Sequence, residues 1–132
     1  MAADRELLER ASDYIARAVR NRRNFDRMLA EGALDKASET LWGLFTDYTH
    51  ALSLVSTGRI LSRHKETVSY AREVGTTRGD DRLLRAVNAA ERMHANFYHG
   101  FVSDPAALRE PFEEISYYAA VIDRLIRSAV AP

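Results

Sequence analysis

The sequence predicts a single all-α domain, an up-down four-helix bundle with an additional short helix. Apolar residues recur at steps of three and four along every long segment, and no segment has the alternation typical of a strand. The breaks between segments are short, which favours antiparallel neighbours. A length of 132 residues suits one domain, residues 1–132, and 46% apolar with 29% charged residues is typical of a globular protein.

The first helix is expected from about Asp4 to Glu31, or with a break within Arg20–Asn24. Gly32 should end it, because glycine readily adopts the left-handed conformation that follows a helix C-terminus. The apolar stripe of this helix consists of Leu7, Leu8, Ala11, Tyr14, Ile15, Ala18, Val19, Phe25 and Leu29.

The second helix should begin near Ala33 and end before Gly58. A third, shorter helix is expected from Arg63 to about Val74, with Ser62 as its N-cap, and the glycine-containing segment 75–79 should be the next break. The second helix has a broad apolar arc, made of Leu34, Ala37, Leu41, Leu44, Phe45, Tyr48, Leu52 and Val55.

The fourth helix should start after a capping Asp80 or Asp81 and continue to about His99. Asp104 followed by a proline predicts a short turn at 105–109. Pro111 should interrupt the chain there, because proline has no amide hydrogen. We therefore expect the last helix from Pro111 to about Ser128.

Composition excludes several classes of protein. There is no cysteine, so neither disulfides nor thiolate metal sites can form. Nineteen basic residues balance nineteen acidic ones, so non-specific nucleic-acid binding through overall charge is not expected. Seventeen of the basic residues are arginine, which favours bidentate contacts with carboxylate or phosphate, or reflects codon usage. No apolar run approaches the roughly 20 residues of a membrane span, so we expect a cytoplasmic protein without membrane association.

The fourth helix carries the candidate catalytic residues, Arg92, Asn96 and His99. Their spacing of i, i+4 and i+7 predicts one polar face. An arginine can clamp a phosphate, a histidine can take or give a proton near neutral pH, and an asparagine can orient either partner. Such a face could cleave RNA without metal, by attack of the neighbouring 2′-hydroxyl on the phosphate. It also fits a solvated helix surface or a polar subunit contact.

Two pairs, Asp47 with His50 and Glu91 with His94, have the spacing of carboxylate–histidine pairs in di-iron bundles. His50 should project nearly opposite the apolar arc of its helix, and Asp47 lies off-centre, so the ligands should not converge. Only His94 faces inward on its helix, where we interpret it as a buried, hydrogen-bonded core residue. His64 is interpreted as a capping or loop residue. We therefore expect no metal and no cofactor, with a metal-binding bundle as an alternative.

Two segments resemble motifs of the HEPN superfamily of helical domains. They are Ala-Ser-Glu-Thr-Leu-Trp-Gly at 37–43 and His-Ala-Asn-Phe-Tyr at 94–98. The likeness covers roughly residues 25–127 and is closest to an archaeal-type branch of small stand-alone proteins. The resemblance implies a HEPN-like four-helix bundle, usually a homodimer, that associates with RNA or nucleotides. Some relatives are ribonuclease toxins of toxin–antitoxin pairs, which act through an arginine and a histidine.

The resemblance places Arg92 and His99 at the positions of that pair. It implies a homodimeric protein that acts on or near RNA or nucleotides as a metal-independent ribonuclease, in which Glu39 and His94 support Arg92, Asn96 and His99. The alternative is a non-catalytic interaction module beside a nucleotidyltransferase-like partner.

Overall fold

The computed structural model describes residues 2–131, with side chains from residue 5 onward. Met1 and Pro132, the two ends of the predicted domain, lie outside the described residues. Between them the chain contains no strand, so the all-α prediction is confirmed. The elements are α1 (Ala2–Ala30), α2 (Leu34–Thr57), α3 (His64–Arg78), α4 (Asp81–His99), the 3-10 turn η1 (Pro105–Leu108) and α5 (Arg109–Val130).

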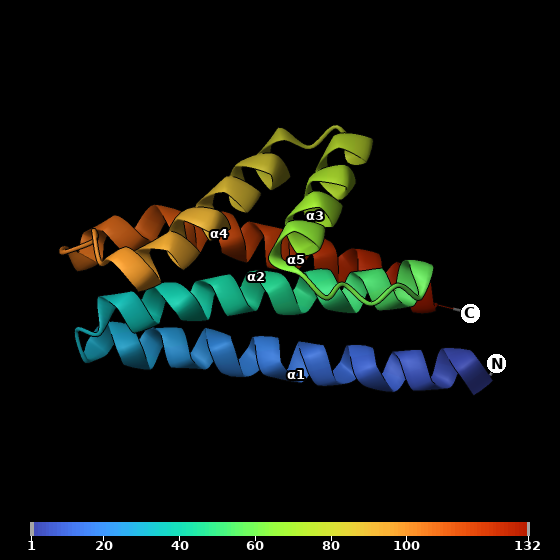
Figure 1. Cartoon of the computed structure of the whole chain (residues 1–132). Helices are drawn as coiled ribbons and strands as arrows, with labels where there is room; N and C mark the ends of the chain where they lie inside the picture. Colours follow the sequence, from blue (N-terminus) through green and yellow to red (C-terminus); the bar gives the residue numbers. More distant parts are fainter. Residues whose placement is uncertain (1, 132) are drawn as a thin grey trace.

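Helix α2 is the centre of the molecule, because α1, α4 and α5 all pack on it. Helices α1, α2 and α5 lie lengthwise beside one another, while α3 and the first half of α4 rise away from them (Figure 1). The four helices α1, α2, α4 and α5 form the predicted bundle, and α3 is the additional, shorter helix. None of the described helices combines the length and the apolarity that crossing a bilayer requires.

Helices α1 and α2 pack through small and large apolar residues spaced seven apart. This spacing keeps one seam of each helix facing the other along its length. The predicted break within Arg20–Asn24 does not occur, because that segment has no glycine or proline and is flanked by residues buried on α2. The buried residues with this spacing of seven are Ala11, Ala18 and Phe25 on α1, and Ala37, Leu44 and Ala51 on α2.

Helix α3 differs from its prediction at both ends. Its N-cap is Arg63 rather than Ser62, whose hydroxyl donates instead to the Glu66 carboxylate at 3.0 Å. The helix also passes through Gly75, which is buried where α3 meets α4. A Cβ atom there would lie 2.8 Å from Leu84 Cδ2, so this glycine serves close packing and not a turn. The helix ends only at Gly79, which has a φ of 64°.

The predicted start signals of α4 and η1 are confirmed, whereas the last helix starts earlier than predicted. Asp80 caps α4 by accepting from the Leu83 amide, and Asp104 caps η1 by accepting from the Ala106 amide. Pro111 is the third residue of α5, so the helix begins two residues before the predicted start. Proline is tolerated there because amides of the first turn have no acceptor within the helix.

Candidate active site

The predicted polar face of α4 is not formed, because Asn96 points into the bundle. Asn96 is fully buried, whereas Arg92 and His99 are exposed. Helix α4 contacts α2, α3 and α5, so its buried arc is wider than one apolar stripe and also includes Met93. The prediction that Asn96 shares an exposed face with Arg92 and His99 is therefore wrong.

Asn96 instead ties the segment after α4 to α2. Its Nδ2 donates to Ser38 Oγ at 2.7 Å, and its Oδ1 accepts from the backbone amide of Val102 at 2.8 Å. Ser38 in turn donates to the Leu34 carbonyl oxygen at 2.8 Å. Both ends of the Asn96 amide are thus engaged inside the protein, as buried polar groups normally are. A sealed side chain of this kind cannot orient a substrate.

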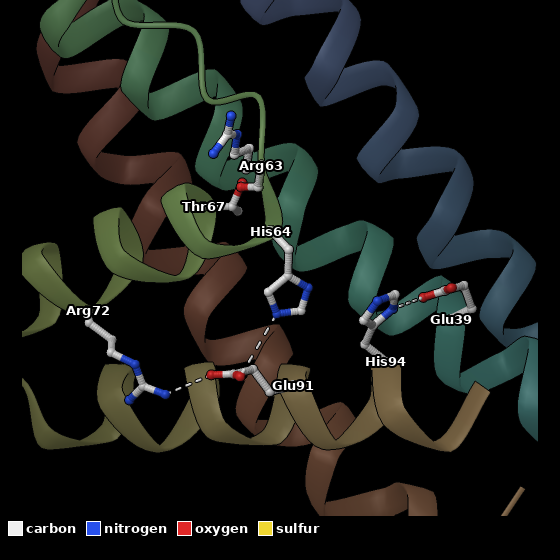
Figure 2. A network of polar contacts seen from close by, with 7 residues as sticks. All are labelled: Glu39, Arg63, His64, Thr67, Arg72, Glu91 and His94. Carbon is white, nitrogen blue, oxygen red and sulfur yellow. Dashed lines mark hydrogen bonds and ion pairs between the residues drawn. The ribbon is translucent and has the colours of Figure 1, made fainter. Parts of the chain in front are cut away.

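His94 lies at the rim of the core. It is hydrogen-bonded, as predicted, with Nδ1 3.0 Å from Glu39 Oε1 on α2, but it is not buried, since 25% of its side chain is exposed. The imidazole also stacks on the Trp42 indole, with ring centroids 4.6 Å apart and an angle of 22° between the planes. Glu39, which Figure 2 shows beside the imidazole, and Trp42 therefore fix a ring that is partly exposed.

His64, the first residue of α3, brings a second imidazole to the same place. Its ring centroid lies 4.7 Å from that of Trp42 and 5.2 Å from that of His94. Since the two imidazoles are so close, both lie over the same face of the indole. His64 Nε2 is 3.9 Å from Glu91 Oε2, and Glu91 Oε1 accepts from Arg72 Nη2 at 2.7 Å (Figure 2). Each imidazole therefore faces a carboxylate from another helix.

A pocket of about 290 Å³ opens beside the two imidazoles, and a third histidine, His50, reaches it from α2. His50 Nε2 is 3.3 Å from Thr67 Oγ1, and its ring stacks on Tyr14 at 4.9 Å. Burial, and to a smaller extent the positive charge of Arg17, lowers the pKa of His50, so this imidazole favours the neutral form. The pocket is lined by Trp42, Thr46, His50, Ser62, Arg63, His64, Thr67 and His94.

Asp47 and His50 are both covered by neighbouring helices, although they lie off the apolar arc of α2. Asp47 accepts from Asn21 Nδ2 at 2.9 Å, because α1 packs over this side of α2. The two carboxylate–histidine pairs of the sequence thus have separate partners. The part of the chain that the structure describes contains no cluster of three or more His, Asp or Glu side chains that could hold a metal ion.

The first turn of α3 brings a helix N-terminus and one basic side chain to the pocket, with Glu66 in the same turn. Arg63, its N-cap, makes no side-chain cap hydrogen bond to the helix amides. The first amides of a helix have no acceptor within it, and the helix dipole makes this end positive. Arg63 itself is exposed at the same turn. A phosphate group at this end of the pocket would therefore meet backbone donors and a positive charge.

A larger groove of about 490 Å³ lies between α2, α3 and α5, away from the histidines. Its walls are mainly apolar, with Leu52, Val74 and Leu125 among the lining residues. Volume alone does not make a reactive site, so we assign the candidate active site to the smaller pocket, where titratable groups converge.

The structure also shows why sequence reasoning missed part of this site. The two motif segments, 37–43 and 94–98, pack against each other through the Ser38–Asn96 and Glu39–His94 contacts. The presence of both motifs in the sequence could therefore have predicted that Glu39 and His94 lie close together. No sequence period connects His64 to them, because its position depends on the path of residues 58–63 and on the tilt of α3.

The fold and this site define a helical-bundle protein with a histidine-lined surface pocket. The model of the archaeal PaREP1/PaREP8 family matches residues 8–116, and the chain belongs to that family. No curated protein and no solved structure is significantly similar to it.

Proposed function

We propose that this protein is a HEPN-like, metal-independent ribonuclease that acts at the pocket shared by His64 and His94. One observation carries the proposal: the two imidazole centroids lie 5.2 Å apart, and each ring faces a carboxylate. Paired titratable groups in different surroundings can act as a base and an acid on the same substrate.

His94 is proposed as the general base. A carboxylate on Nδ1 favours the tautomer with hydrogen on that nitrogen, which leaves Nε2 as the acceptor. His94 Nε2 accepts the proton of the RNA 2′-hydroxyl while that oxygen attacks the adjacent phosphorus. Glu39 does not touch the substrate and is a positioning residue.

His64 is proposed as the general acid. Glu91 Oε2 lies 3.9 Å from its Nε2, so a carboxylate faces this imidazole. As the bond from phosphorus to the 5′-oxygen breaks, the imidazolium donates its proton to that oxygen. The products are a 2′,3′-cyclic phosphate and a free 5′-hydroxyl. Arg63 and the first amides of α3 would stabilise the charge on the phosphate oxygens.

The relation to the HEPN superfamily adds proposals about partners. The chain is proposed to form a homodimer that acts on or near RNA or a nucleotide, in which the exposed Arg92 and His99 of two α4 helices would meet at the subunit contact. The alternative function is a non-catalytic module that pairs with a nucleotidyltransferase-like protein. Light scattering tests the dimer. Cleavage of RNA by the wild type, and its loss in the pocket variants, separates the two functions, because a non-catalytic module cleaves nothing.

The ribonuclease proposal is tested by incubating RNA with purified protein in excess chelator. His64→Gln and His94→Gln should each reduce the cleavage rate by roughly 10²- to 10⁴-fold, the usual contribution of a general acid or base. His99→Gln is the matched control, because it removes an exposed histidine of α4 outside the pocket. Arg92→Ala should also retain activity.

Other outcomes of this assay contradict the proposal in distinct ways. Loss of cleavage in Arg92→Ala and His99→Gln, but not in the pocket variants, would move the active site to the exposed pair. Equal cleavage by all variants would identify a contaminating nuclease. Loss of wild-type activity in chelator would favour the metal-binding bundle.

A further inference from the structure

Two exposed aromatic residues lie at the C-terminal end of α4: Tyr98 in its last turn, in contact with the proposed base, and Phe101 two residues after the helix ends. Tyr98 is 68% exposed and Phe101 is 57% exposed, the highest values among the exposed large hydrophobic residues of the described chain. Isolated exposed apolar residues are common on protein surfaces, but two large aromatic residues three positions apart, one of them against His94, indicate a contact surface.

Tyr98 is held in place from one side only. It lies one helical turn after His94 and meets that imidazole edge-on, with centroids 5.2 Å apart and an angle of 87°. Its other aromatic neighbour is the half-buried Phe97, at 5.1 Å and 76°. The position of the phenol ring is thus defined by packing while most of its surface remains in solvent.

Trp42 is not available for the same purpose. The face of the indole that borders the pocket is covered by His64 and His94, whose centroids lie 4.7 and 4.6 Å away. Any base that enters beside these imidazoles must therefore stack elsewhere, and Tyr98 is the exposed ring that contacts His94.

We propose that Tyr98 and Phe101 form a stacking platform for unpaired bases, and that the substrate is single-stranded RNA. This inference depends on the proposed function, because it places the stacked base next to the phosphate on which His94 acts. Base–aromatic stacking requires the face of a base to be accessible, which a duplex denies except at its ends. The chain has a formal net charge of zero, so stacking would supply attraction that overall charge does not.

The platform is tested by binding, separately from cleavage. The probe is a labelled 2′-O-methyl oligoribonucleotide of about ten nucleotides, which lacks the attacking hydroxyl, as a single strand and as a blunt duplex. Fluorescence anisotropy should show that the protein binds the single strand at least tenfold more tightly than the duplex. Tyr98→Ala and Phe101→Ala should each weaken that binding by about tenfold, the lower part of the range for one stacked base.

Two further variants separate stacking from general hydrophobic contact. Tyr98→Trp should retain affinity because it keeps an aromatic face, whereas Tyr98→Leu should not. Leu8→Ala, which truncates an exposed apolar residue of α1, is the control and should leave binding unchanged.

Unchanged affinity of the Tyr98→Ala, Phe101→Ala double variant would overturn the inference, and so would equal affinity for the two probes. A lower molar mass of that variant by light scattering, with RNA binding intact, would instead assign the rings to a contact between copies. If the wild type binds single strands through Tyr98 but cleaves nothing, only the ribonuclease proposal fails. If it cleaves RNA without preferring single strands, only the platform fails.

Discussion

Asn96 Nδ2 donates to Ser38 Oγ at 2.7 Å, and neither residue has any exposed surface. This hydrogen bond crosses the interface between α2 and α4 and connects segments 37–43 and 94–98. It also changes the interpretation of the asparagine, from a group that contacts substrate to one that stabilises the fold.

Asn96→Ala should therefore lower stability. The change leaves the Val102 amide without its acceptor, and Ser38 Oγ, which still donates to the Leu34 carbonyl oxygen, without its donor. An unsatisfied buried group costs about 1–3 kcal/mol. We expect a loss of about 3 kcal/mol in the free energy of unfolding, measured by urea denaturation. His99→Gln on the same helix should change it by less than about 0.5 kcal/mol. A stable Asn96→Ala protein that has lost cleavage would restore the catalytic interpretation.

Glu39→Gln should affect catalysis through the tautomer of His94. The glutamine amide can donate to Nδ1, so the carboxylate no longer dictates which ring nitrogen carries hydrogen. We expect the cleavage rate to fall by roughly tenfold or more. The ¹⁵N chemical shifts of the imidazole should show a change of tautomer population, which a merely structural effect would not produce. An unchanged tautomer with a reduced rate would contradict the positioning role.

Asp47 should make stability depend on pH. Burial raises its pKa from 3.8 to about 6, against the opposing effects of the Asn21 hydrogen bond and of Arg17 and Arg20. Because the folded-state pKa is the higher one, the folded protein binds more protons than the unfolded chain between about pH 4 and 6. Stability attributable to this group is therefore present at low pH and is lost as the pH rises through about 6.

Asp47→Asn should remove this dependence. At about pH 7 the variant should be more stable than the wild type by about 2 kcal/mol, and near pH 4 the two should be similar. Urea denaturation across this range measures the difference. The control is Asp26→Asn, whose exposed carboxylate pairs with Arg22. A difference between Asp47→Asn and wild type that does not vary with pH would show that the carboxylate is not perturbed.

Gly43→Ala should be destabilising only while Asn21 is present. A Cβ atom at Gly43 would lie 2.6 Å from Asn21 Nδ2, the atom that donates to Asp47, so this hydrogen bond must break or move. In an Asn21→Ala background the clash is gone, and the same change should stabilise the helix by about 0.5–1 kcal/mol. A double-mutant cycle measures this reversal of sign. The same effect in both backgrounds would rule out the clash as its cause.

The helix bounds were largely predictable because their causes are local. Gly32, Gly58, Gly79 and Gly100 all follow helix ends in the left-handed conformation, and Asp80 and Asp104 cap the elements that follow them. Gly75 was misjudged as part of a break because the reason for a glycine there is a contact with Leu84. That contact is between two helices, and the sequence of neither helix alone predicts it.

The surroundings of single side chains were harder to predict. The helical period predicts Asn96 among the exposed polar residues of α4, whereas it is buried. It predicts His50 off the apolar arc of α2, where His50 does lie, but half-buried. Both side chains are covered for one reason: α2 and α4 each pack against three or more neighbours, so their buried surfaces exceed a single stripe. Polar residues then lie inside the bundle and require partners such as Ser38 and Thr67.

The sequence by itself determined that this protein is an all-α bundle, where its helices lie, and that segments 37–43 and 94–98 matter together. Helical period and end signals operate over a few residues, so they can be read without coordinates. Only the tertiary structure decided that the imidazoles of His64 and His94 both stack on Trp42. It also decided that Asn96 is buried while Arg92 and His99 are exposed. Those outcomes depend on the angles at which helices distant in sequence cross. Side-chain packing between the helices sets these angles, and no local sequence pattern predicts them.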